Sequence, residues 1–193
     1  GVFMVGTSHP GVGSELADEL AQAPRSHDGF DCFIAPNSGA LFRIIGRIWA
    51  LARSLPNEPL AEFERLVREA PSTTEVERLR KERIGQDVFR RALLNYWEDA
   101  CAVTGVKNST LLRASHVIPW ARCESDEERL NVHNGLLLVA TLDAAFDAGL
   151  VSFADDGSIL ISGKLSVADQ ISSGIGKHMR LTRMHDEVRK RLA

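Results

Sequence analysis

A histidine and two aspartates in the C-terminal half of the sequence have types and spacing that suit acid–base and metal chemistry. His116 ends a predicted strand, where a side chain is held in place yet reaches solvent. A neutral imidazole has a suitable pKa to accept a proton from water near pH 7. Asp143 and Asp147 are four residues apart, so a helix would place both carboxylates on one face. Two such carboxylates repel each other unless a cation lies nearby, and hard oxygen ligands suit Mg²⁺ or Mn²⁺.

Short apolar runs separated by turn residues predict the elements that must position these side chains. We expect a strand from Leu111 that runs into a loop limited by Pro119, then a turn ending at Gly135. A buried strand over 136–139 follows, and Thr141 is expected to cap a short helix over 142–148. Further along, the pattern predicts a hairpin of strands 150–153 and 158–162, and a last helix from Leu181 to Leu192.

The N-terminal half shows helical periodicity. Apolar residues over 41–52 form one stripe, Asn57 is expected to cap a second helix, and Ser72-Thr-Thr-Glu75 resembles a capping box that opens a third. Gly85 is expected to interrupt that helix before another apolar stripe over 84–97. Residues 1–38 predict, more weakly, strands over 2–5 and 31–35 and a helix over 14–23.

These patterns predict an α+β chain in which a helical N-terminal part packs on a C-terminal core of two strands and a helix, with an added β-hairpin. A doubly wound parallel sheet is disfavoured, because the turns between the C-terminal strands are too short for crossover helices.

Composition excludes several broad classes. The chain has 193 residues, a net charge of −3 and 44% hydrophobic residues, which is unlike a disordered or polybasic protein. No stretch approaches the ~20 apolar residues that span a bilayer, and the apolar run at the start is too short to be the core of a signal peptide. We therefore expect a cytoplasmic location and no membrane partner. Three widely spaced cysteines argue against a disulfide scaffold.

Basic residues near His116 are candidates for contact with phosphates. The segment Thr104–Arg122 contains Lys107, Arg113 and Arg122 and no acidic residue. His133 could also face a phosphate, and a solvated turn is the alternative for this residue. For the lysine and the arginines, the alternative is an ordinary charged surface.

Two motifs together resemble one family. The first motif is Arg113-Ala-Ser-His116-Val-Ile-Pro-Trp120, and the second is Asn134-Gly-Leu-Leu-Leu-Val-Ala-Thr-Leu-Asp143-Ala-Ala-Phe-Asp147. With these two motifs the sequence resembles the HNH endonucleases, in the bacterial branch with a Ser-His-x-x-Pro-Trp motif. The resemblance covers roughly Thr74 to Ser162. It implies that residues 71–193 form an HNH nuclease domain with a ββα-metal core, a helical lead-in and a C-terminal helix. Residues 1–70 would then be a partly helical accessory region.

The resemblance also implies roles for individual residues. His116 would be the general base that activates water, and Asn134 would orient this base and brace its loop. Asp143 stands where the family places a metal-binding His or Asn, and Asp147 stands at a second position that some members use. Ser115 replaces the Asp or His ligand that many members carry just before the catalytic histidine, and a hydroxyl is a weak ligand. One Mg²⁺ or Mn²⁺ ion per active site is expected.

A structural zinc is not expected from this resemblance. Many relatives bind zinc through two CxxC pairs, and the corresponding positions here read Cys101-Ala-Val-Thr104 and Val139-Ala-Thr-Leu142. Only one thiol remains, so hydrophobic packing must replace the metal.

The function implied by the resemblance is a metal-dependent endonuclease that hydrolyses DNA, in a restriction or phage-defence setting. The alternative is an HNH module whose catalytic centre has decayed and which acts as a DNA-binding or regulatory protein; Ser115 is its main support. The sequence does not determine the oligomeric state, and a homodimer is one option.

Overall fold

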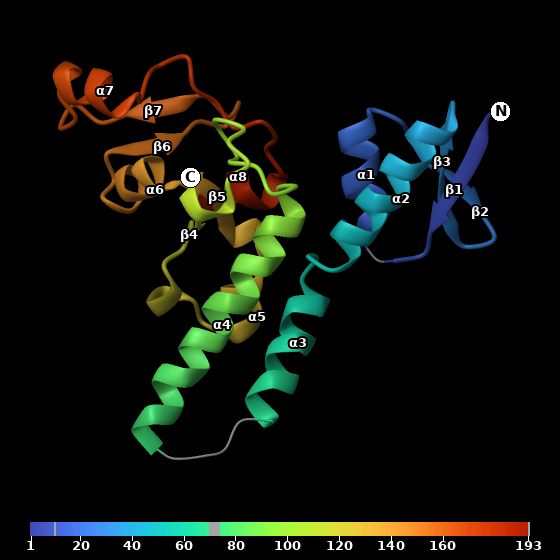
Figure 1. Cartoon of the computed structure of the whole chain (residues 1–193), viewed down its shortest axis with the longest axis horizontal. Helices are drawn as coiled ribbons and strands as arrows, with labels where there is room; N and C mark the ends of the chain where they lie inside the picture. The colour runs from blue at the N-terminus through green and yellow to red at the C-terminus, as the bar shows by residue number, and fades with distance from the viewer. Residues whose placement is uncertain (10, 70–73, 193) are drawn as a thin grey trace.

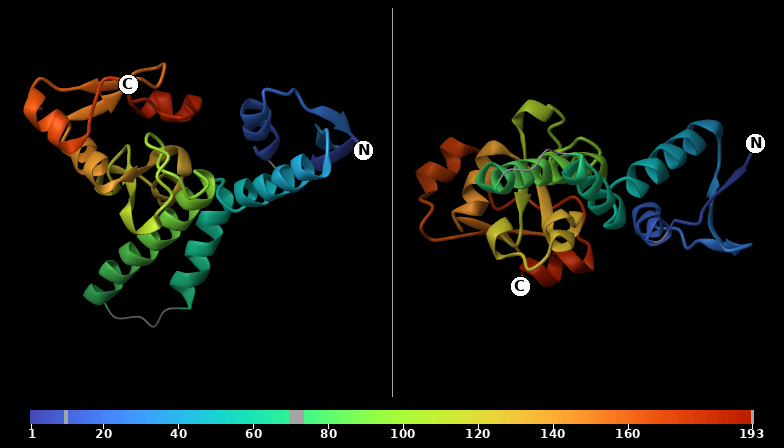
Figure 2. Two further views of the ribbon diagram at one scale, coloured as in Figure 1. Left: turned by 45° about the horizontal axis from the view of Figure 1, so that its top comes forward. Right: turned by 90° about the horizontal axis from the view of Figure 1, so that it is seen from below.

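The computed structural model describes residues 1–9, 11–69 and 74–192, with only the backbone for 74–78. The chain has the expected α+β architecture, with helices and small antiparallel sheets. Figure 1 shows the N-terminal sheet at one end and the C-terminal segments at the other, with the helices α3 and α4 between them. The two views in Figure 2 show the same separation.

The N-terminal part contains a three-stranded antiparallel sheet. Strands β1 (Phe3–Thr7), β2 (Arg25–His27) and β3 (Phe30–Ala35) lie in the order β1-β3-β2. Helix α1 (Val12–Leu20) follows β1 and buries Val12 and Leu16. The weakly predicted strands and helix of this region are therefore present, while β2 was not expected.

Three helices connect the sheet to the C-terminal core. Helix α2 (Ser38–Ala52) begins where Asn37 Oδ1 accepts a hydrogen bond from the Ala40 amide at 2.8 Å. Helix α3 (Asn57–Arg68) begins one residue earlier than expected, since Pro56 rather than Asn57 occupies the N-cap. Helix α4 (Thr74–Tyr96) packs along α3, as Figure 1 shows. The predicted capping box over 72–75 lies outside the described residues.

The expectation that Gly85 interrupts α4 is wrong. The helix continues through this residue, and a Cβ built there would lie 2.3 Å from the Trp120 ring. The glycine therefore permits close packing of the tryptophan against the helix instead of ending it.

The C-terminal core follows the predicted order of strand, loop, strand and helix. Strand β4 (Leu112–His116) pairs antiparallel with β5 (Gly135–Val139), with His116 opposite Gly135. The connection contains the short helix α5 (Asp126–Leu130), and helix α6 (Ala140–Asp147) packs on both strands. Three 3₁₀ turns complete it: η1 (Ser109–Leu111), η2 (Trp120–Arg122) and η3 (Val132–Asn134). Thr141 does not cap α6, because the helix starts at Ala140.

The chain after the core was predicted in part. The hairpin forms from β6 (Val151–Phe153) and β7 (Ile159–Ile161). Helix α7 (Val167–Ser173) was not expected, and α8 (Asp186–Leu192) starts five residues later than predicted. The His185 side chain delimits this start, because its Nδ1 accepts a hydrogen bond from the Glu187 amide at 3.1 Å.

One cluster of buried apolar side chains runs through both halves of the chain, from Val12 on α1 to Val188 on α8. Arg47 of α2 strengthens this junction, since its guanidinium donates to the last carbonyls of α4, at Asn95 and Tyr96, and pairs with Glu19 of α1. Among the residues that the structure describes, no helix has the length and apolar character needed to cross a bilayer.

Candidate active site

His116 lies at the end of β4, wedged between two aromatic rings. Its imidazole stacks on Phe89 of α4, with ring centroids 3.9 Å apart and 18° between planes. The Trp120 ring meets it edge-on at 5.7 Å. The residue is partly buried, and packing between the two rings fixes the orientation of its side chain.

One hydrogen bond decides which ring nitrogen of His116 can act as a base. Nε2 lies 2.9 Å from the carbonyl oxygen of Arg129, which can only accept. Nε2 therefore carries the proton, and the lone pair lies on Nδ1. Burial lowers the pKa of His116, and the Arg129 carbonyl and the Asp147 carboxylate oppose this shift. The ring is thus a neutral base near pH 7.

The Asn134 side chain holds the loop that follows β4. It is fully buried, and its Oδ1 accepts a hydrogen bond from the Ile118 amide at 2.8 Å. Its Nδ2 donates to the Ile118 carbonyl at 3.2 Å and to the Glu128 carbonyl at 3.3 Å. The expected bracing contacts are therefore present in the geometry, and they reach His116 through the loop rather than by direct contact.

The two aspartates project from α6, which packs against β4. Asp143 is partly buried and Asp147 is exposed. Burial raises the pKa of the Asp143 carboxyl, the adjacent Ser115 hydroxyl lowers it, and the Asp147 carboxylate raises it. Because Asp147 also influences the pKa of His116, these four side chains share one electrostatic environment. The predicted base and Ser115 thus lie at the end of β4, and both aspartates lie on the helix that packs against this strand.

Ser115, Asp143 and Asp147 offer oxygen atoms, the ligand type that hard divalent cations take. Ser115 Oγ is buried without a hydrogen bond of standard geometry, and burial raises the pKa of the Asp143 carboxyl. His116, Asp143 and Asp147 are not among the described groups of three ligands within 4.8 Å of one another. Few protein ligands and several waters are what Mg²⁺ commonly takes.

The predicted phosphate-binding residues are not all available. Lys107, Arg113 and Arg122 are exposed, although the Arg113 guanidinium also donates to the carbonyls of Thr110 and Leu112. His133 is only 7% exposed and packs edge-on against Tyr96. The expectation that it faces a phosphate is therefore not supported, because η3 turns the ring into the interior.

Sequence reasoning missed the residues that fix the His116 ring. The Phe89 ring and the Arg129 carbonyl are distant in sequence, at 27 and 13 residues from the histidine. The sequence pattern places Phe89 only in an apolar stripe, and a backbone acceptor has no sequence signal. The Arg129 side chain also helps to hold Trp120 beside His116, since its Nε donates to the Trp120 carbonyl at 3.2 Å.

Comparison with known protein families gives a match for this part of the chain. Residues 101–154 match a family described as HNH endonuclease. The matched segment contains β4, the loop braced by Asn134, β5 and α6, and it covers less than a third of the chain. The resemblance noted from the sequence is confirmed for this segment. No curated protein matches the chain.

Proposed function

We propose that the protein is a divalent-metal-dependent HNH endonuclease that hydrolyses DNA phosphodiester bonds. The HNH segment supports nuclease activity on nucleic acids in general. The single observation that carries the specific proposal is the hydrogen bond from His116 Nε2 to the Arg129 carbonyl, which leaves Nδ1 as the basic nitrogen.

In this proposal His116 removes a proton from the attacking water. The neutral ring accepts the proton at Nδ1, and the positive charge that develops is stabilised by the carbonyl at Nε2 and by Asp147. Phe89 and Trp120 exclude bulk water from one side of the ring and hold its plane. General-base catalysis of this kind contributes a factor of ~10²–10⁴.

Asp143 is the proposed principal metal ligand, Asp147 an auxiliary one, and Ser115 a weak or water-mediated one. A Mg²⁺ or Mn²⁺ ion held there would polarise the phosphoryl oxygens and stabilise the leaving oxygen. Carboxylate oxygens without an imidazole favour these ions over Zn²⁺ at this place. Asn134 acts as a positioning residue through the 118–128 loop.

Exposed basic side chains at Lys107, Arg113 and Arg122 are the proposed contacts to the DNA backbone. Residues 1–70 would form an accessory region that senses a signal or selects a target, as in restriction or phage-defence nucleases. A homodimer is compatible with this assignment. The second candidate function is a decayed module that binds DNA without cutting it, which Ser115 in place of an ionic ligand favours.

Cleavage of supercoiled plasmid in Mg²⁺, Mn²⁺ or chelator tests the proposal. The wild type should nick DNA only with a divalent ion, and His116→Ala and Asp143→Ala should each lose at least ~10²-fold in rate. His27→Ala and Asp28→Ala are matched controls, since these side chains are 66% and 86% exposed and far from β4 in sequence.

Two outcomes separate the candidate functions. Ser115→Asp should lower the Mg²⁺ concentration needed for half-maximal rate, because it restores a carboxylate ligand. DNA binding by a protein that never cuts in any ion would support the decayed module. A normal rate for Asp143→Ala at the normal Mg²⁺ midpoint would show that the metal assignment is wrong.

A further inference from the structure

A second cluster of ligand-type side chains lies away from β4, where α1, η3 and the residue before α8 meet. Glu15, His133 and His185 place one ligand atom each within 4.8 Å of one another. Glu15 Oε1 lies 3.4 Å from His133 Nε2 and 3.5 Å from His185 Nε2. Glu15 is 6% exposed and His133 is 7% exposed. Such burial sets the cluster apart from a chance gathering of surface charges.

These spacings match those of ligands around one tetrahedral ion. Two atoms that each bind a zinc ion at ~2.0–2.1 Å, with a tetrahedral angle between them, stand about 3.4 Å apart. The measured distances of 3.4 and 3.5 Å therefore need little adjustment of the Glu15 oxygen relative to either nitrogen.

Two polar atoms of the cluster have no hydrogen-bond partner among the described residues. These atoms are Glu15 Oε1 and His133 Nδ1, and both are buried. The other oxygen, Glu15 Oε2, accepts a hydrogen bond from the Tyr96 hydroxyl at 3.1 Å, which orients the carboxylate. Buried polar atoms without partners are rare and call for an explanation.

His133 does not supply a positive charge to the Glu15 carboxylate. Burial lowers the pKa of His133 to about 3, with the charges of His185 and Arg191 acting in the same direction. The ring is therefore neutral at pH 7 and offers a lone pair rather than a positive charge. Burial also raises the pKa of Glu15, and the charges of His185 and Arg183 offset only part of this shift.

We propose that Glu15, His133 and His185 bind one transition-metal ion of the zinc class, which ties the N-terminal region to the HNH segment. Two imidazoles and one carboxylate suit Zn²⁺ better than Mg²⁺. The three ligands come from sequence positions more than 50 residues apart, so the ion cross-links the tertiary structure. The site shares no residue with the Asp143 centre, and it is distinct from the lost CxxC positions around Cys101 and Val139.

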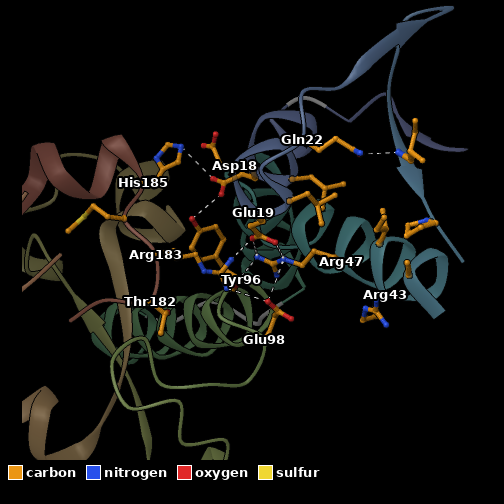
Figure 3. Close-up of a pocket in the computed structure, with 18 residues that line it drawn as sticks. Asp18, Glu19, Gln22, Arg43, Arg47, Tyr96, Glu98, Thr182, Arg183 and His185 are labelled. Atoms are coloured by element: carbon orange, nitrogen blue, oxygen red, sulfur yellow. Dashed lines mark hydrogen bonds and ion pairs between the residues drawn. The ribbon is translucent and has the colours of Figure 1, made fainter. Parts of the chain in front are cut away.

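Access for the ion comes from a cleft of ≈ 940 Å³ that Glu15 and His185 line together with Tyr96, Arg47 and Arg183. Figure 3 shows the Tyr96 ring between the His185 and Arg47 side chains. Three protein ligands leave a fourth position, which a water molecule from the cleft can fill.

Binding requires two local adjustments. The rings of His133 and His185 stack at 4.0 Å with 14° between planes, so both must rotate to direct their lone pairs at one ion. His185 Nδ1 now accepts the Glu187 amide, and a metal on Nε2 would place the ring proton on Nδ1 and break this cap. One capping bond is a small loss beside a three-ligand ion site.

Titration of the chelator-treated full-length protein with Zn²⁺ alone tests the site. The Asp143→Ala background removes the other proposed metal centre, so the expected result is one Zn²⁺ per chain in both proteins, with a rise in Tm on saturation. Co²⁺ should give the visible absorption of a tetrahedral site.

His185→Ala is the decisive variant, because the side chain is 26% exposed and its loss should leave the fold intact. It should weaken Zn²⁺ binding at least ~100-fold and remove the rise in Tm. His178→Ala and Asp18→Asn are matched controls, since both residues are exposed. No tight Zn²⁺ in the wild type, or undiminished binding and Co²⁺ absorption in His185→Ala, would overturn the proposal whatever the DNA-cleavage result.

Discussion

Replacing Gly85 by alanine tests how α4 positions the residues that hold His116. Gly85 is buried inside the helix, where a Cβ would lie 2.3 Å from the edge of the Trp120 ring. The ring would have to move by roughly 1 Å to restore ordinary contact at ~3.5 Å. Trp120 meets His116 edge-on, and its carbonyl accepts from Arg129, so the displacement reaches the residues that hold the base.

The magnitude follows from two opposing effects. Alanine in place of glycine stabilises a helix interior by ~1 kcal/mol. Overpacking at a tight contact costs ~1–3 kcal/mol, and here the indole that must shift also packs edge-on against His116. The clash should therefore prevail, and Gly85→Ala should lower the free energy of unfolding by ~0–2 kcal/mol. A ~1 Å shift of the base can lower the cleavage rate by up to ~10²-fold.

Gly46 of α2 provides the matched control, since nothing lies within 4 Å of a Cβ built there. Gly46→Ala should gain only from the higher helix propensity of alanine and stabilise the protein by ~1 kcal/mol. Urea denaturation followed by circular dichroism measures both variants, and plasmid cleavage measures the effect on the base. Equal stabilisation by the two substitutions, with unchanged cleavage by Gly85→Ala, would refute the reasoning.

Two further predictions concern His116 and the loop that follows it. Burial lowers the pKa of His116 below its usual 6.5, so the neutral base persists as the pH falls. The acid limb of the cleavage-rate profile should therefore have its midpoint below 6.5, and a bound cation shifts this midpoint in the same direction. A midpoint above 6.5 would contradict the assignment. Asn134→Ala removes a fully buried side chain that pairs with the Ile118 amide and carbonyl, so the free energy of unfolding should fall by ~2–4 kcal/mol. Asn108→Ala, which removes an exposed turn cap, should cost at most ~1 kcal/mol, and equal losses in urea denaturation would argue against the bracing role.

The local order of the HNH segment could be predicted from the sequence. Apolar runs and turn residues predicted β4, β5, α6 and the β6–β7 hairpin because strand and helix periodicity are written in neighbouring residues. The position of His116 at the end of a strand follows from the same pattern. The α+β class also follows, since short turns cannot connect parallel strands.

Packing partners could not be predicted this way, and Gly85 shows why. A glycine in a helical pattern is ambiguous until its neighbour is known, and here Trp120 occupies the space of the absent side chain. The stacking of Phe89 on His116 likewise depends on how α4 crosses β4. Such contacts join residues that no local pattern relates.

The sequence by itself determined the residue types, the local elements and the spacing of the Asp143–Asp147 pair. Only the tertiary structure decided that His133 is buried, that Arg129 fixes the tautomer of His116, and that Glu15, His133 and His185 meet. Periodicity acts over a few residues, whereas burial, pKa and ligand geometry depend on which distant segments the hydrophobic core brings together.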